Sequence, residues 1–232
     1  VVPVVPEQGS LGASGDLAPL SHIALVLIGR GEAYYQNERM DGAAAMSKAN
    51  IPTYHLVAKE GLALINGTQC MTALAALAWY DLARGAALAD ICCSLTMEAL
   101  TSLTSACDPE LHTLRPHKGQ AATARNLLRL MANSPTTEAS RNLRVQDAYA
   151  IRCVPQVHGA VVDAINYAKG VITTELNSVT DNPIILPERG DVISGGNFHG
   201  EPIAIVCDFL KIAASELASI SERRLERMVN PA

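Results

Sequence analysis

The fold class is decided by one stretch, Thr68–Ala106, which reads TQCMTALAALAWYDLARGAALADICCSLTMEALTSLTSA. Alanine, leucine and other helix formers dominate this stretch, proline is absent from it, and Gly85 is its only glycine. We therefore expect a single helix that spans on the order of 55 Å. Apolar residues lie on most sides of that helix, which predicts that it packs deep in a bundle.

Breakers and caps on both sides of this stretch outline further elements. Before it, Asp41 is a suitable N-cap for a short helix through Lys48, and residues 32–39 suit short extended pieces. After it, residues 108–119 carry two prolines and a glycine, which is typical of a connector. The remaining expectations are helices over Gln120–Asn133, Val157–Thr180 and Ile203–Met228, an exposed polar loop over Ser134–Arg144, and a small hairpin over 183–193.

These long helices predict an all-α architecture, a long-helix bundle with a small hairpin, in which residues 1–232 form a single helical segment. Hydrophobic residues make up 49% of the chain and aromatic residues 4%, which suits an aliphatic, alanine-rich core. The formal net charge of -5 argues against a nucleic-acid partner, which would need clustered lysine and arginine. No uninterrupted apolar run reaches membrane-spanning length, so we expect neither a membrane span nor a signal peptide.

The cysteines and histidines do not follow a metal-binding pattern. The chain has six of each, but it contains neither a Cys-x-x-Cys pair nor a His-x-x-x-His pattern. We therefore expect no metal site. Free, buried thiols in a reducing cytosol are the simplest account of the cysteines, and they indicate a cytoplasmic protein.

Candidate chemistry lies in the stretch Gly9–His22, which reads GSLGASGDLAPLSH. Its run of small residues, Gly12–Gly15, lets the backbone approach itself closely because bulky side chains are absent. An apolar segment that predicts a helix follows directly. Asp16 suits the N-cap of that helix, or it assists chemistry in the loop.

The tripeptide Ala13-Ser14-Gly15 can form an electrophile from its own backbone. The amide nitrogen of Gly15 attacks the carbonyl carbon of Ala13 and closes a five-membered ring, since no Cβ crowds the attacking residue. Loss of two waters, one of them from the Ser14 side chain, then leaves an exocyclic methylene conjugated to the ring. No unmodified side chain supplies so strong an electrophile. The alternative is an ordinary flexible loop before a helix.

Four further blocks follow the loop along the chain: Gly61–Gln69, Val145–Arg152, Thr180–Pro183 and Ser194–Pro202. In this order they resemble the aromatic amino acid ammonia-lyases and aminomutases, whose helical core belongs to the ammonia-lyase/fumarase-like superfamily. The resemblance implies that Ala13, Ser14 and Gly15 mature into 4-methylidene-imidazol-5-one, with no metal and no dissociable cofactor. Family members are considerably longer, so we expect an internal segment that lacks the family's N- and C-terminal portions.

Asn66 lies in a glycine-bounded break between two helical runs. An asparagine in such a turn can simply satisfy backbone groups. The resemblance implies a second role, because the matching asparagine of the family contacts the substrate amine and the prosthetic group.

Tyr149 and Arg152 are three residues apart, so on a helical turn they share one face. An arginine offers a planar fork that grips a carboxylate, and every α-amino acid carries one; a surface ion pair is the alternative for Arg152. The resemblance assigns the matching arginine to the substrate carboxylate and places the matching tyrosine near the prosthetic group. It places Phe198 beside the prosthetic group and the substrate ring, and Gln146, one turn before Tyr149, is a supporting hydrogen-bonding residue.

The implied reaction is the non-oxidative removal of ammonia from an aromatic amino acid by a carbon–nitrogen lyase. The residues around Gln69, Cys153, His158 and Glu201 resemble histidine ammonia-lyases, which implies conversion of L-histidine to urocanate in histidine catabolism. A tyrosine or phenylalanine ammonia-lyase, or an aminomutase, is the alternative. The family's catalytic base is a tyrosine on an N-terminal loop, so we expect that base and the chief selectivity residues upstream of Val1.

The resemblance also implies a homotetramer whose active sites combine residues from three subunits. The long apolar helices fit the burial that such interfaces need. A hypothesis of another class is a non-catalytic helical assembly module, which applies if the loop does not mature.

Overall fold

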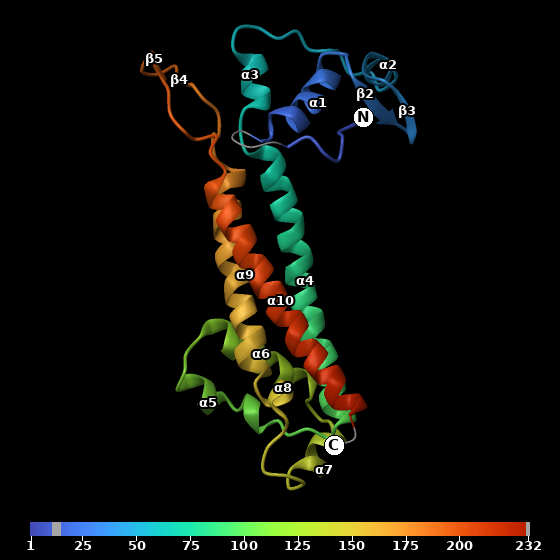
Figure 1. Ribbon diagram of the computed structural model, residues 1–232, viewed down its shortest axis with the longest axis vertical. Helices are drawn as coiled ribbons and strands as arrows, with labels where there is room; N and C mark the ends of the chain where they lie inside the picture. The colour runs from blue at the N-terminus through green and yellow to red at the C-terminus, as the bar shows by residue number, and fades with distance from the viewer. Residues whose placement is uncertain (11–14, 231–232) are drawn as a thin grey trace. The chain divides into compact units, whose positions relative to one another are not determined.

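The computed structural model describes residues 1–10 and 15–230 (Figure 1). The chain divides into two compact units, one formed by Val1–Ala75 with Ile172–Ala204 and the other by Ala76–Val171 with Ile205–Ala232. We call them unit 1 and unit 2. The prediction of an all-α, long-helix architecture is confirmed: the longest elements are the helices α4 (Gln69–Ala99), α9 (Val154–Leu176) and α10 (Glu201–Val229).

Unit 1 contains two small antiparallel sheets (Figure 1). The first has the order β1 (Val2–Pro3), β2 (Glu32–Tyr35), β3 (Glu38–Asp41). The two residues between β2 and β3, Gln36 and Asn37, have φ values of 48° and 67°, which suits the tight turn of a two-residue hairpin. The second sheet is the hairpin of β4 (Ile184–Leu186) and β5 (Asp191–Ile193), which confirms the hairpin expected over 183–193.

Three helices of unit 1 precede the long ones: α1 (Leu17–Leu27), α2 (Gly42–Lys48) and α3 (Glu60–Ile65). The predicted cap of α2 is present, since the Asp41 carboxylate accepts a hydrogen bond from the Ala43 amide at 2.9 Å. A small apolar core joins α1, β2 and α2 through Val26, Ala33, Ala45 and Met46.

Unit 2 adds a series of short helices to its share of the long ones. They are the 3-10 helix η1 (Ser105–Cys107) and the α-helices α5 (Pro109–Thr113), α6 (Lys118–Leu130), α7 (Pro135–Ser140) and α8 (Tyr149–Arg152). The helix expected over Gln120–Asn133 is therefore confirmed as α6. The apolar core of unit 2 includes Cys93, Met97, Leu127, Val154 and Ile220.

Two expectations about this region are wrong. The long helix ends at Ala99 instead of continuing to Ala106, and Thr101 then adopts a left-handed φ of 50°. The segment Ser134–Arg144 is not an exposed loop, because it contains α7. Ser134 caps that helix by accepting from Thr137, and Ser140 at its end is buried and donates to the carbonyl of Ser102.

The long helices of unit 2 are joined by specific contacts. On α4, Trp79 donates its indole hydrogen to the carbonyl of Ile165 on α9 at 2.9 Å. On α9, Tyr167 packs edge-on against Phe209 of α10, with ring centroids 6.1 Å apart.

Helices α6 and α9 approach through a pair of glycines. A Cβ placed on Gly119 would lie 2.0 Å from the carbonyl oxygen of Gly159, and one placed on Gly159 would lie 2.3 Å from the backbone of Gln120. These two backbones therefore leave no room for a side chain. The amide of Gly119 is also satisfied across this contact, because it donates to the Asp163 carboxylate at 2.8 Å.

A buried polar network links the three long helices α4, α9 and α10 inside unit 2. His158 of α9, only 1% exposed, lies between Asp90 of α4 and Arg224 of α10. Its Nδ1 is 2.7 Å from the Asp90 carboxylate and its Nε2 is 3.2 Å from the Arg224 guanidinium. Arginine can only donate, so Nε2 accepts and Nδ1 carries the proton. The second Asp90 oxygen accepts from Asn126 at 2.8 Å.

Arg224→Met is expected to lower the free energy of unfolding by about 3 kcal/mol, because it leaves a buried Asp90–His158 pair without its cation. The neighbouring Arg223 is a matched control, since its side chain is 57% exposed and pairs with the exposed Glu222. Arg223→Met is expected to change stability by less than about 0.5 kcal/mol. Urea unfolding of both variants measures the difference, and equal effects would contradict a stabilising role for the network.

The expectation of buried thiols is only partly correct. All six cysteines are free, and Cys93 and Cys107 are buried, whereas Cys92 is exposed and the other three are half-buried. Adjacent helix residues point to different sides, which separates Cys92 from Cys93. Burial raises the pKa of the Cys93 thiol to about 11 and that of Cys107 to about 12, so both thiols stay protonated.

One described segment, Glu60–Ala99, is long and apolar enough to cross a membrane by length and composition alone, since an 18-residue window within it has a mean hydropathy of 1.3. The long core helix of a bundle meets the same criterion, so this feature is weak evidence for a membrane span.

Candidate active site

The tripeptide Ala13-Ser14-Gly15 lies mostly outside the described residues, which begin again at Gly15. Gly15 is half-buried in the turn before α1, and Asp16 after it is 4% exposed. Asp16 occupies the predicted N-cap position of α1, but its side chain makes no capping hydrogen bond to that helix. Its carboxylate instead accepts from the Met71 amide at 2.9 Å, in the first turn of α4. Asp16 thus anchors the C-terminal end of the tripeptide to α4.

The hydrogen bond from Met71 to Asp16 bears on whether the residues around the tripeptide suit a prosthetic group formed from it. Met71 lies five residues after Asn66, so Asp16 ties the tripeptide to the same helix start that follows the predicted amine-binding asparagine. Gly15 also carries no Cβ that would hinder ring closure. The described residues therefore fit the group.

Asn66 lies at the C-cap of α3 and is 8% exposed. Its side-chain nitrogen donates to the Asp181 carboxylate at 3.2 Å and to the Asn182 carbonyl at 3.3 Å. Both acceptors come from the segment that links α9 to β4, more than a hundred residues further along the chain. Unit 1 therefore brings together two of the sequence blocks, Gly61–Gln69 and Thr180–Pro183.

Asp181 is the centre of this cluster. Its second carboxylate oxygen forms a short ion pair with Lys59, and the Asn182 amide donates to its first oxygen at 2.7 Å. Burial by itself would raise the pKa of Asp181. The hydrogen bonds from Lys59, from the Asn182 backbone and from Asn66 outweigh burial and hold that pKa below its usual 3.8.

The lowered pKa of Asp181 predicts an acid-sensitive contribution to stability. A carboxyl whose pKa is lower in the folded state stabilises the fold above its usual pKa of 3.8, and the contribution disappears as the pH falls through the lowered value. At neutral pH, Asp181→Asn is therefore expected to lower the melting temperature by about 2–4 °C. Melting curves of both proteins on an acidic pH series should converge below pH 3.8; a constant difference would contradict the assignment.

Phe198 lies in the loop before α10, half-buried, and the structure ties this loop to the same cluster. The Asn182 side-chain oxygen accepts from the Gly195 amide at 2.7 Å and from the Ser194 hydroxyl at 3.2 Å. Asn197 donates to the carbonyl of Val179 at 3.2 Å. The segment 179–182 therefore holds both Asn66 and the loop that carries Phe198.

Gln146, Tyr149 and Arg152 lie in unit 2, at and just before the short helix α8. Asp147 is buried and fixes the start of this segment, since its carboxylate accepts from the Leu103 amide at 2.6 Å and from Arg144 at 2.8 Å. Ile151 turns into the core of unit 2. Tyr149 and Arg152 are exposed.

The spacing of Tyr149 and Arg152 predicts a shared face, and this is confirmed. The Arg152 guanidinium carbon lies 5.4 Å from the centroid of the Tyr149 ring. Arg152 is exposed, and no ion pair within residues 1–10 and 15–230 involves it, so the alternative of a surface ion pair is not observed. Its guanidinium is therefore open to a ligand carboxylate.

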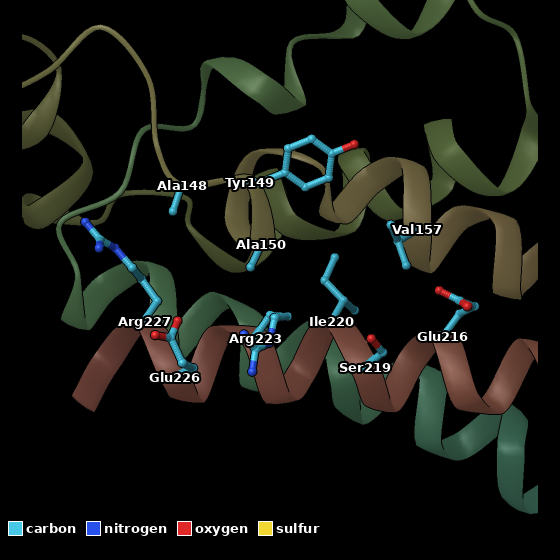
Figure 2. A pocket seen from close by; sticks show the side chains of 10 residues that line it. All are labelled: Ala148, Tyr149, Ala150, Val157, Glu216, Ser219, Ile220, Arg223, Glu226 and Arg227. Carbon is cyan, nitrogen blue, oxygen red and sulfur yellow. The ribbon is translucent and has the colours of Figure 1, made fainter. Parts of the chain in front are cut away.

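Tyr149 lines a pocket of about 360 Å³ against α10 (Figure 2). The ring, 71% exposed, lies across the pocket from Ile220 and from a row of charged side chains on α10 that includes Glu216, Arg223 and Glu226. Gln146 is exposed and lines a neighbouring pocket beside Asp147 and Arg144. In the part of the chain that the structure describes, no three His, Cys, Asp or Glu side chains form a group that could hold a metal.

Sequence reasoning missed Lys59, Asp181, Asn182 and Asp147 as supporting residues. The last three lie in blocks that matched the family, so the signal that could have found them was present, but no chemistry singled them out. Lys59 carried no signal, because its partner is 122 residues away in the chain.

Comparison with known proteins supports one family over the whole chain. The family model described as "Aromatic amino acid lyase" matches residues 1–232. A histidine ammonia-lyase of Caldanaerobacter subterraneus subsp. tengcongensis is 58% identical over 230 residues, which cover 99% of this chain and 45% of that relative. The chain thus spans about half the length of the curated relatives it matches.

Solved structures agree in fold. The crystal structure of histidine ammonia-lyase from Trypanosoma cruzi is 44% identical with a TM-score of 0.86, covering 99% of this chain and 42% of that chain. Tyrosine aminomutase from Streptomyces globisporus is 38% identical with a TM-score of 0.90, covering 99% of this chain and 47% of that chain.

Proposed function

The chain belongs to the aromatic amino acid lyase family, and we propose that the protein containing it removes ammonia from L-histidine to give urocanate. The observation that carries the choice of substrate is sequence identity. Curated relatives named histidine ammonia-lyase are 58%, 55% and 56% identical to this chain in alignments that cover nearly its full length. Backbone shape does not separate the candidates, since the aminomutase superposes at least as well as the histidine enzyme.

In this proposal the side chains singled out above contact an amino acid substrate. Arg152 binds the substrate carboxylate with its planar fork, and each charge-assisted hydrogen bond contributes roughly 1.5–3 kcal/mol. Tyr149, held against Arg152, lies near the reacting group, and Gln146 supports the carboxylate site. Asn66 binds the substrate amine, and Phe198 contacts the substrate ring.

A 4-methylidene-imidazol-5-one group formed from Ala13, Ser14 and Gly15 would supply the electrophile that makes the amine a better leaving group. The residues of this chain orient the substrate around it. Asp16 anchors the tripeptide to α4, and the start of α1 directs its positive dipole end toward developing negative charge.

The second candidate is a tyrosine or phenylalanine lyase, or an aminomutase that returns the amine to the β-carbon. The fit to tyrosine aminomutase, with a TM-score of 0.90, keeps this candidate open. We propose the histidine reaction over it because identity to that structure is 38%, against 44% for the histidine enzyme.

Steady-state assays of the full-length gene product test the choice. L-Histidine, L-tyrosine and L-phenylalanine are each supplied, and the unsaturated acids and β-amino acids formed are quantified. We expect urocanate from histidine, with a kcat/KM at least about tenfold above that for the other two substrates. A β-amino acid product, or a preference for tyrosine or phenylalanine, would overturn the proposal.

We further propose that the protein assembles as a homotetramer with shared active sites. Large apolar side chains of α4 face solvent, with Leu77 64% and Leu95 65% exposed, which supports burial against further subunits. Light scattering of the full-length gene product tests this. If the chain associates but its loop never matures, the hypothesis of a non-catalytic assembly module replaces the proposal of an enzyme.

A further inference from the structure

The orientation of the Asn66 amide is fixed by its surroundings. The amide nitrogen carries two hydrogens, and it faces two groups that can only accept, the Asp181 carboxylate at 3.2 Å and the Asn182 carbonyl at 3.3 Å. A reversed amide would place its oxygen against both acceptors. The nitrogen and oxygen of this amide are therefore assigned by the network.

The consequence is that the Asn66 carbonyl oxygen is directed away from the cluster. Both donors of the amide are used within unit 1, whereas none of the hydrogen bonds among the described residues uses the oxygen. This oxygen is not among the buried polar atoms that lack a partner in the described residues, so it is accessible and can accept from a ligand that carries an N–H or O–H donor.

Asp181 can hold the Asn66 amide in this orientation only while its own carboxyl group is ionised. Lys59 and the Asn182 amide hold its two oxygens, and the side chains of Lys59 and Asp181 are only 23% and 14% exposed. Lys59 itself is held at the start of α3 in a left-handed conformation, with a φ of 70°. An amide or a protonated carboxyl at position 181 would be able to donate, and the preference for one orientation of Asn66 would be lost.

We propose that Asp181 is a positioning residue, which turns Asn66 so that its carbonyl oxygen faces the α-amino group of the substrate. This inference rests on the proposed function and extends it to specificity. The Lys59–Asp181–Asn66 relay makes the site select ligands that donate from the α-nitrogen over otherwise identical ligands that lack it.

The test compares two ligands in the full-length gene product. L-Histidine carries the amine, and 3-(imidazol-4-yl)propanoate, which differs from it only by lacking the amine, is supplied as a competing ligand. Asp181→Asn is expected to lower kcat/KM for histidine by about tenfold to a hundredfold. The inhibition constant of the propanoate is expected to stay within about twofold, because it never used the Asn66 oxygen. Asp191→Asn, in the exposed hairpin ion pair with Arg189, is the matched control and should change neither value.

A double mutant shows whether Asp181 acts through Asn66. If it does, Asn66→Ala with Asp181→Asn is expected to match Asn66→Ala alone within about twofold. Independent, multiplicative losses would overturn the proposal, and so would equal weakening of both ligands by Asp181→Asn. If wild-type protein forms no urocanate, the proposed function fails; if it does and Asp181→Asn matches it, only this inference fails.

Lys59→Met provides a second variant that keeps the carboxylate, in case Asp181→Asn does not fold. Without its cation, the pKa of Asp181 rises toward or above its usual value. The acidic limb of kcat/KM against pH is therefore expected to move to higher pH, while kcat/KM near neutral pH falls less than in Asp181→Asn. If the acidic limb of kcat/KM against pH does not move in Lys59→Met, the proposed coupling from Lys59 through Asp181 to Asn66 is contradicted.

Discussion

Ser14→Ala in the full-length gene product is expected to abolish ammonia elimination, with a loss in kcat of at least about a thousandfold. Alanine has no side-chain hydroxyl to lose as water, so the exocyclic methylene cannot form. The same variant should therefore lack the electrophile while retaining the fold. Intact mass measures this directly, because a wild-type chain that has matured as proposed would be lighter than the encoded chain by two waters.

Ser47→Ala is the control for this prediction, since Ser47 is an exposed serine on α2. It should keep both the mass deficit and the activity. Wild-type protein that turns over histidine at the full encoded mass would refute the proposed maturation at Ser14. Full activity in Ser14→Ala would remove the basis for the electrophile altogether.

Arg152→Met is expected to lower kcat/KM by roughly a hundredfold to ten-thousandfold, because two charge-assisted hydrogen bonds to the substrate carboxylate are lost. Arg152→Lys keeps the charge but not the planar fork, so it should recover only part of the loss. Steady-state kinetics with histidine measures both. The effect should fall mainly on substrate binding, since the carboxylate is not the reacting group.

The control for charge removal in the same unit is Arg141→Met, which breaks an exposed ion pair with Glu138. It should leave kcat/KM within about twofold of wild type. An equal loss in Arg141→Met and Arg152→Met would show a general effect of net charge. No loss in Arg152→Met would place the substrate carboxylate elsewhere.

The long helices could be predicted from the sequence because their signals are local and redundant. The last helix, expected over Ile203–Met228, spans Glu201–Val229, since a long run without glycine or proline leaves few alternatives. The end of α4 could not be predicted as well. Residues 100–106 continue the same composition, and Thr101, in its left-handed conformation, accepts a hydrogen bond from Arg144, which lies 43 residues further along the chain.

The short helices and the supporting residues depend on distant partners, which local patterns do not contain. Ser140 belongs to α7 because it is buried against Ser102, and no periodicity in that polar segment indicates this. Asp16 has the residue type and position of a helix cap, yet its carboxylate reaches across to Met71. In the candidate site, the sequence placed Tyr149 and Arg152 on one face, but the carboxylate that orients Asn66 emerged only from the fold.

The contact between Gly119 and Gly159 has a consequence for how this gene can change. Every amino acid other than glycine carries the Cβ that this crossing excludes, so each missense mutation in either codon forces two helices apart. Alanine, the mildest replacement, already places an atom within 2.0 or 2.3 Å of a neighbouring backbone. Among folded variants from natural variation or random mutagenesis, almost all nucleotide changes in these two codons should therefore be synonymous, whatever the substrate of the full-length protein.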